Sequence, residues 1–552
     1  MIPADVDGDG VITALTMDYT AVDGGSLYAL LWDWAHANDV VDVANATRKA
    51  QAFSLNTVAA DTQGDIFYTG YQMTPCRHQL DKNPDGTWAN GADPNLLIDG
   101  TRYRGFEVPL TEDLTADETL VDDPIRCIVP WDEYPHSFTP DKGYLLTANN
   151  DPGGITFDND LVNEPWYMAG PWMEGFRADA IDRNLAALTA DHSADLASMS
   201  AVQGFHQSTV GRQFAPHLIA ALERAQALAA ATAPPDADTS DARMVALYAE
   251  RADQLDEVLS RLQGWAARGF EAASGVETFY HPTVDATEHD DAVATMIWNV
   301  IQGDVFRDAI GDEGLAGMRP TGDTGRTRLL KLMLENRGQN PGGLASWNPE
   351  TGESAFWDDR TTPGVIEQSD ELLVRAATRG LDFLASPGPG DGTGGFGTED
   401  MDAWVWGLRH QVQLRSLLAS FIDDPMLTPI LEGFAITTDR LPLADNLASD
   451  DPRKELLWFP RPGDNLGVDA CNNGTGGRGF RCGSGPVMRQ VFALGPNGVE
   501  GVDVIPGGQS GLTSSPHFDD QAGLWLANEA LPMRYTVEDV IAHAEKRETF
   551  TP

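Results

Sequence analysis

The chain has 552 residues, 42% of them hydrophobic, and 14 tryptophans, which is enough for one very large domain or several ordinary ones with filled cores. Its 84 acidic side chains against 37 Lys and Arg give a formal charge of −47, which excludes nucleic acid and anionic membranes as partners. A solvated acidic coat explains this charge, and a set of calcium sites is the alternative. No apolar run approaches the roughly 18 residues of a membrane-spanning helix, so none is expected.

The first part of the chain predicts mixed strand and helix. Residues 10–25 alternate as a strand does, and residues 26–50 have the apolar spacing of a helix with Ser26 as its N-cap. From Phe53, two strand-like runs are joined by the turn at 61–64, which predicts a β-hairpin. Residues 74–142 are rich in Pro, Gly, Asn and Asp and predict a long surface loop.

From about residue 178 the apolar spacing becomes helical, and strands return near the end of the chain. Helices are predicted within 179–192, 213–232, 244–262, 290–309, 366–384 and 404–422. Strands are predicted at 487–495 and 499–507, followed by a helix that begins at Thr536 and ends near Lys546. Strands, many helices and strands again predict an α+β protein with one sheet-containing core and a large helical excursion.

The chain has four cysteines, at positions 76, 127, 471 and 482. An even, low number fits two disulfides in an exported protein, and four reduced buried thiols are the alternative. Cys471 and Cys482 flank a glycine-rich stretch that one disulfide would close. The first residues have neither the basic region nor the apolar core of a signal peptide, so an exported protein would have to be a processed or truncated product.

Several common site motifs are absent or incomplete. The D-x-D-x-D-G string at 5–10 opens like a calcium loop, but Thr16 stands where an EF-hand needs a glutamate, so a tight acidic turn is expected. There is no G-x-S-x-G, H-E-x-x-H, P-loop or dinucleotide-binding motif. The acidic string at 288–291, which contains His289, is typical of a helix start.

Four segments, in this order, carry a resemblance to a known family. They are ADTQGDIFYTGY (60–71), GYLLTANNDPGGITFDND (143–160), FRADAIDRNL (176–185) and VIPGGQSGLTSSPHFDDQAGLW (504–525). Together they resemble the β-subunit of the penicillin acylase family, which includes acyl-homoserine-lactone acylases. The fourth string is long and specific, and the resemblance is weakest in the helical middle and in residues 74–140.

The resemblance implies an N-terminal-nucleophile hydrolase with a four-layer αββα sandwich, of which this chain holds a part. Residues 1–165 would belong to that core, residues 166–460 would form the helical excursion, and residues 461–552 would return to core strands and a C-terminal helix. In such enzymes the first residue of the β-subunit is a serine, and its free α-amine acts as the base, so no histidine is needed. The attack makes an acyl-enzyme, which water then hydrolyses.

The resemblance also implies roles for four residues. Asn149 would donate its side-chain amide to the oxyanion, and Arg177 would support the surroundings of the nucleophile. Leu55 would line the acyl pocket, and Asp160 would contribute to a structural calcium site. An ordinary turn at Asn149, a structural arginine at the start of a helix and a plain core leucine are the alternatives for the first three.

The family's serine-bearing strand has no counterpart among these residues, and Ser26 is rejected because it lies at a helix start. We therefore expect a fragment of a periplasmic or secreted amidase, inactive alone, that hydrolyses a small-molecule acyl amide. Its partners would be the α-subunit and the N-terminal part of the β-subunit, with no nucleic acid and no membrane. No cofactor is expected for catalysis, only a structural calcium. A non-catalytic homologue that binds acyl amides, or a calcium-dependent scaffold, is the alternative.

Overall fold

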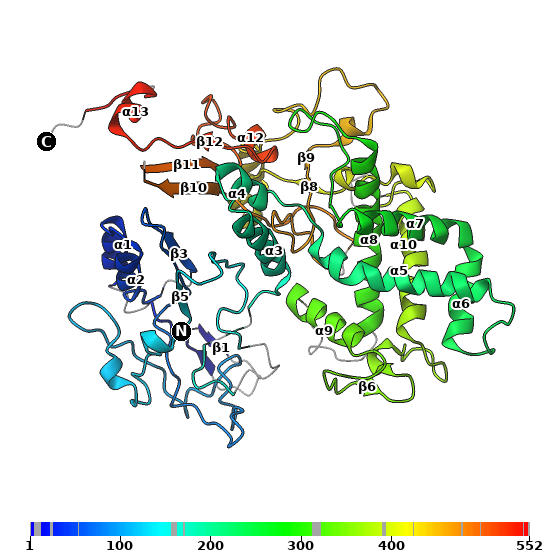
Figure 1. Cartoon of the computed structure of the whole chain (residues 1–552), viewed down its shortest axis with the longest axis horizontal. Helices are drawn as coiled ribbons and strands as arrows, with labels where there is room; N and C mark the ends of the chain where they lie inside the picture. The colour runs from blue at the N-terminus through cyan, green and yellow to red at the C-terminus, as the bar shows by residue number, and fades with distance from the viewer. Residues whose placement is uncertain are drawn as a thin grey trace. The chain divides into compact units, whose positions relative to one another are not determined.

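The computed structural model divides the chain into two compact units, coloured along the chain in Figure 1. It describes residues 2–4, 13–21, 26–52, 55–155, 163–168, 170, 172–311, 322–388, 394–422, 424–475, 478–496, 498–544 and 546–549. Unit 1 comprises Met1–Ala178, Leu185–His192 and Ala493–Val499, and unit 2 comprises Asp179–Asn184, Ser193–Phe492 and Glu500–Pro552. Helices and small antiparallel sheets occur together, which confirms the α+β class.

Unit 1 contains the predicted hairpin. Strands β3 (Thr57–Ala60) and β4 (Ile66–Thr69) pair antiparallel, and β5 (His136–Phe138) adds on the other side of β4. The side chain of Asp61 fixes the turn by accepting hydrogen bonds from the backbone N–H groups of Gln63 and Asp65, at 2.9 and 3.0 Å. Two short strands, β1 (Ile2–Ala4) and β2 (Thr13–Leu15), also pair antiparallel. The string at 5–10 and the start of the predicted strand at 10–25 lie outside the described residues.

The single helix predicted over 26–50 is wrong, because the chain breaks into α1 (Leu27–Ala35) and α2 (Val40–Thr47). Asp39 adopts an extended backbone, and its carboxylate accepts a hydrogen bond from the N–H of Asp42 at 2.8 Å, so it caps the second helix. Ser26 makes no capping bond with its side chain. The break lets α2 pack against both α1 and the β3–β4 hairpin.

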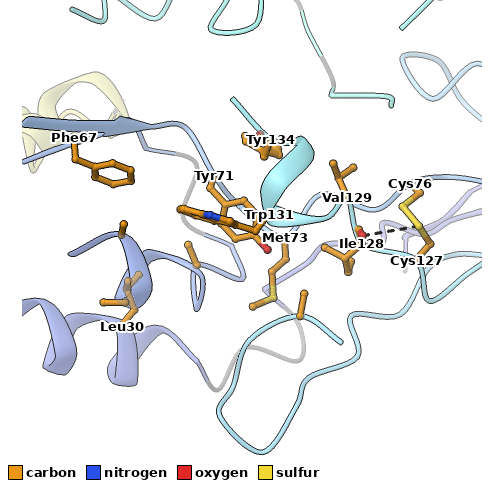
Figure 2. Packing of buried hydrophobic residues seen from close by; sticks show 14 of the residues in the cluster. Leu30, Phe67, Tyr71, Met73, Cys76, Cys127, Ile128, Val129, Trp131 and Tyr134 are labelled. Carbon is orange, nitrogen blue, oxygen red and sulfur yellow. Dashed lines mark hydrogen bonds between the residues drawn. A yellow bond between two sulfur atoms is a disulfide. The ribbon is translucent and has the colours of Figure 1, made fainter. Parts of the chain in front are cut away.

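The core of unit 1 shows that residues 74–142 are more than a surface loop. Figure 2 shows Trp131, Ile128 and Val129 from this segment packed with Tyr71 and Met73. The rings of Tyr71 and Trp131 meet edge to face with centroids 4.9 Å apart. The disulfide between Cys76 and Cys127 joins the two ends of the excursion. Its few regular elements include the 3₁₀ turns η1 (Glu118–Leu120) and η2 (Trp131–Glu133).

Unit 2 contains most of the predicted helices. They are α4 (Leu196–Gln203), α5 (Thr209–Ala229), α6 (Ser240–Glu250), α7 (Ala252–Ala267), α8 (Ala286–Ile310), α9 (Asp323–Glu335) and α10 (Ser369–Ala385). Helix α3 (Phe176–Ala190) precedes them. Helices α5, α7 and α10 each pack against α8, as Figure 1 shows. The pattern over 244–262 is two helices, because Arg251 leaves the helical conformation.

The helix predicted over 404–422 is wrong. The segment follows the 3₁₀ turn η4 (Met401–Ala403) and forms two more short 3₁₀ turns, η5 (Trp406–Leu408) and η6 (Leu417–Ser420), on either side of strand β8 (Gln411–Val412). Strand β8 pairs with β9 (Phe459–Pro460), and the imidazole Nδ1 of buried His410 lies 2.6 Å from the carbonyl oxygen of Phe480. Long-range pairing thus overrides a local helical pattern.

Helix α8 is buried around most of its circumference, yet it carries a row of polar side chains. Asp291, Thr295, Asn299 and Gln302 are each 3% exposed or less and follow one another at helical spacing on one face. Asp291 binds Arg268 at 2.6 Å, and the Thr295 hydroxyl donates to the carbonyl of Asp291 at 2.7 Å. Most polar atoms in such a buried row are expected to have hydrogen-bond partners, so an exception needs an explanation.

The C-terminal part of the chain returns to strands as predicted. Strands β10 (Arg489–Gly495), β11 (Gly498–Val504) and β12 (Leu531–Pro532) form one sheet; α12 (Ala522–Leu526) lies between β11 and β12 in the chain, and α13 (Val537–Ala542) follows β12. Thr536 caps α13 by accepting from the N–H of Asp539 at 3.0 Å. A second disulfide joins Cys471 and Cys482, so the prediction of two disulfides is confirmed and the reduced-thiol alternative is wrong.

A buried ionic network joins these C-terminal segments. The Asp469 carboxylate accepts from Arg461 and Arg489, each at 2.8 Å, and from the Asn528 amide at 2.9 Å. Burial alone would raise the pKa of Asp469, but Arg461, His206 and Arg489 outweigh burial and hold that pKa well below its usual range.

No described helix is long and apolar enough to cross a membrane.

Candidate functional site

The segment predicted to carry the oxyanion donor forms a tight turn in unit 1. Asn149 has a φ of 60°, in the left-handed region that asparagine tolerates better than most residues. The side-chain oxygen of Asn150 accepts from the N–H of buried Ala148 at 3.0 Å, which stabilises the turn. The side chain of Asn149 is exposed at the tip of this turn.

The structure brings Asn149 and Arg177 together. The Nη2 of Arg177 donates to the carbonyl oxygen of Ala148 at 2.7 Å and to the side-chain oxygen of Asn149 at 2.8 Å. Because an amide has one oxygen and one NH₂ group, a donor held on the oxygen leaves the nitrogen as a donor for another molecule. No described residue accepts a hydrogen bond from that nitrogen. The pair therefore presents a neutral N–H donor at a fixed turn.

Glu174 lies close to this pair and was missed in the sequence. It is 6% exposed, and neither of its carboxylate oxygens has a hydrogen-bond partner among the described residues. Burial lowers the pKa of Arg177, and the negative charge of Glu174 opposes this effect. The only signal in the sequence was a glutamate three residues before Arg177, which is common at helix starts.

Leu55 lies beside a hydrogen-bonded link to the turn of Asn149. Its side chain is 56% exposed, so the alternative of a plain core leucine is wrong, and its role in an acyl pocket stays a prediction. The next residue, Asn56, accepts a hydrogen bond from the Tyr68 hydroxyl at 2.9 Å. Burial raises the pKa of Tyr68, and a hydrogen bond with the Thr147 side chain opposes this effect. Thr147 belongs to the same segment as Asn149, so the hairpin and the turn are connected.

The predicted calcium ligand, Asp160, lies outside the described residues, and its role stays a prediction. Within the described part of the chain, the cluster with metal-ligand spacing is Cys76, His78 and Cys127. Both cysteines belong to a disulfide, so their sulfurs are not thiolates and this cluster does not fit a metal ion.

Unit 2 has a cavity of about 340 Å³, and none of the predicted site residues lines it. Its polar lining includes His206, Glu271, His281 and Glu288. His281 Nε2 lies 2.7 Å from the Glu288 carboxylate, and this hydrogen bond raises the pKa of His281. Burial raises the pKa of Glu271, partly offset by the charge of His206. His206 lies 65 residues before Glu271, and no local sequence motif predicted this cavity.

Comparison with known proteins decides the family. The model of the penicillin amidase family matches residues 6–542.

The chain belongs to the penicillin amidase family. This confirms the resemblance found in the four sequence segments, and it assigns the chain to the hydrolases that act on amides. A solved structure to which the chain is similar is the thermostable penicillin G acylase from Alcaligenes faecalis, at 15% identity with a TM-score of 0.44. That match covers 97% of this chain and 74% of the other. No curated protein sequence matches the chain.

Proposed function

We propose that this penicillin-amidase chain is the larger part of an amidase that cleaves a linear amide between an acyl group and an amine. The acyl amide would be a β-lactam with its side chain, an N-acyl-homoserine lactone or a similar small molecule. One observation carries the proposal. Arg177 holds the amide oxygen of Asn149 at 2.8 Å, which leaves the amide nitrogen free to bind an oxyanion.

The reaction in this proposal uses an N-terminal serine that lies outside this chain. The serine hydroxyl attacks the acyl carbonyl while its own α-amine takes the proton. The Nδ2 of Asn149 donates to the oxyanion that forms, the C–N bond breaks, and the proton passes to the leaving amine. Water then hydrolyses the acyl-enzyme to the free acid.

The remaining parts of the proposal concern the complete enzyme. The described sheets of this chain would complete a four-layer αββα sandwich together with an α-subunit and the N-terminal part of the β-subunit. The chain alone would be inactive, and the enzyme would be periplasmic or secreted. Leu55, an exposed residue just before strand β3, would line the acyl pocket, and Asp160 would help to bind a structural calcium.

The test is amide hydrolysis by the chain assembled with the segment that carries the serine, using chromogenic phenylacetyl and long-chain acyl amides. Asn149→Gly keeps the left-handed backbone and removes the side-chain amide with its N–H donor, so we expect kcat to fall about 10²–10³-fold. Asn446→Gly is the matched control, because Asn446 is also exposed with a φ of 55°. That variant should retain full activity.

Three outcomes would overturn parts of the proposal. Hydrolysis by the isolated chain would show that it is not inactive alone. Acyl-amide binding without turnover by the complete assembly would instead favour a non-catalytic homologue. Equal activity in Asn149→Gly and Asn446→Gly would remove Asn149 from the mechanism.

A further inference from the structure

Asp464 is a buried carboxylate of unit 2 that forms no ion pair with any of the described side chains. It is 1% exposed, and one oxygen, Oδ2, accepts from the Ser208 hydroxyl at 2.5 Å and from the Asn299 amide at 3.2 Å. The other oxygen, Oδ1, has no hydrogen-bond partner among the described residues. Burial raises the pKa of Asp464 to about 6, and the bonds from Ser208 and Asn299 oppose this effect.

A carboxylate in this position is unfavourable unless a positive charge accompanies it, because desolvating an unpaired ion costs several kcal/mol. Five residues later, the same part of the chain has a buried carboxylate that is paired with positive charges. There Asp469 is equally buried and is paired with Arg461 and Arg489. Among the described residues no Lys, Arg or His forms an ion pair with Asp464, so its compensation must come from a proton or a bound ion.

Two further buried oxygens without partners belong to Gln302 and Asn473, which both contact the side chain of Asn299. The Asn299 side-chain oxygen accepts from the Gln302 amide at 2.8 Å and from the Asn473 amide at 3.5 Å. The Oε1 of Gln302 and the Oδ1 of Asn473 have no hydrogen-bond partner among the described residues. Gln302 is 2% exposed.

The orientation of these amides follows from Asp464. Its carboxylate can only accept, so the NH₂ of Asn299 faces it and the oxygen of Asn299 faces away. That oxygen in turn requires the NH₂ groups of Gln302 and Asn473, which leaves the oxygens of both amides without donors. Asp464 Oδ1, Gln302 Oε1 and Asn473 Oδ1 are thus three buried oxygens in one chain of hydrogen-bonded side chains, and none of them has a donor among the described residues.

We propose that Asp464, Gln302 and Asn473 bind a hard cation, Na⁺ or Ca²⁺, inside unit 2. Carboxylate and amide oxygens are the ligands that such ions prefer, and the three side chains include no thiolate or imidazole that would select zinc. The ion neutralises Asp464 and satisfies three oxygens at once. The ligand set does not include Asp160, and the proposal does not depend on the amidase proposal.

The test compares the thermal unfolding of the full chain, freed of metal by a chelator, in choline chloride, NaCl and CaCl₂ at equal ionic strength. We expect Tm to rise about 3 °C in Na⁺ or Ca²⁺ at a hundredfold excess over Kd, and not in choline. Asp464→Asn should abolish the rise and lower the number of bound ions by one, as measured by elemental analysis or ²³Na NMR. Asp253→Asn, which removes an exposed carboxylate on α7, should change neither.

A second variant keeps the test decisive if Asp464→Asn does not fold. Gln302→Glu adds a second carboxylate to the ligand set, so it should raise the affinity for Ca²⁺ relative to Na⁺ at least tenfold. No difference between choline, Na⁺ and Ca²⁺ in the wild type would overturn the proposal and indicate water or a protonated Asp464. A cation effect that both variants leave unchanged would also overturn it, because the ion would then bind elsewhere.

Discussion

Arg177 donates a hydrogen bond from Nη2 to the side-chain amide oxygen of Asn149, at 2.8 Å, in addition to a bond to the backbone. The same guanidinium nitrogen reaches the carbonyl oxygen of Ala148 at 2.7 Å. One side chain thus fixes both the backbone before the turn and the rotation of the amide at its tip. The orientation of the proposed oxyanion donor depends on this arginine.

Replacing Arg177 should therefore impair turnover more than substrate binding. In the assembled enzyme we expect Arg177→Ala to lower kcat about 10²-fold, because the Asn149 amide loses its fixed rotation. Arg177→Lys keeps the positive charge but lacks the planar guanidinium group, so its kcat should lie between that of the wild type and that of Arg177→Ala. Steady-state kinetics check this, and a change in KM with unchanged kcat would show that Arg177 acts on substrate binding instead.

Removing the Asp469 carboxylate should destabilise unit 2 strongly. Asp469→Asn leaves buried Arg461 without its counter-charge, so we expect a loss of about 3–5 kcal/mol in the free energy of unfolding. Glu335→Gln breaks the exposed pair with Lys331 and should cost less than about 1 kcal/mol. Urea unfolding measures both.

The lowered pKa of Asp469 also fixes the sign of an acid effect. Its contribution to stability is present above the unfolded pKa of about 3.9 and is lost as pH falls through the lower folded pKa. Asp469→Asn should therefore flatten the decline in stability below about pH 4. An unchanged acid profile would contradict this.

His281 should titrate above its ordinary range because of Glu288. The hydrogen bond that His281 donates to the Glu288 carboxylate raises the pKa of His281, so its contribution to stability is full below about pH 6.5 and is lost as pH rises through the folded pKa. Glu288→Gln should lower the pKa of His281. An NMR titration of the imidazole measures the change, and exposed His543 in the same spectra is the internal reference. Equal values in both proteins would show that Glu288 does not set this pKa.

The two disulfides should stabilise the chain unequally. Loop-closure entropy predicts about 4 kcal/mol for the separation of 51 residues between Cys76 and Cys127, and about 3 kcal/mol for the separation of 11 between Cys471 and Cys482. Replacing both cysteines of a pair by serine should thus cost more for the first pair. Denaturant unfolding of the two double variants tests the order, and the reverse order would indicate residual structure in the unfolded chain.

The sequence predicted elements that local patterns determine and failed where distant segments decide. Helices α5, α8 and α10 and the β3–β4 hairpin follow from apolar spacing and turn residues. The break at Asp39 was missed because a capping aspartate also fits within a helical pattern. The segment 404–422 was predicted wrongly because its pairing with Phe459–Pro460 cannot be read locally.

The same distinction applies to the sites. The link between Asn149 and Arg177 was expected only through the family resemblance, since 28 residues separate them. The contact between Asn299 and Asp464 spans 165 residues and has no signal in the sequence. Asp464 resembles any other loop aspartate until the fold buries it.

The enclosure of helix α8 determines how unit 2 will exchange its amide protons with solvent. Helices α5, α7 and α10 surround it, so its N–H groups meet deuterated water only when the whole helical unit opens. Deuterium uptake in α8 therefore reports the global opening of that unit. Uptake in α13, which has no buried residue, reports only local fraying.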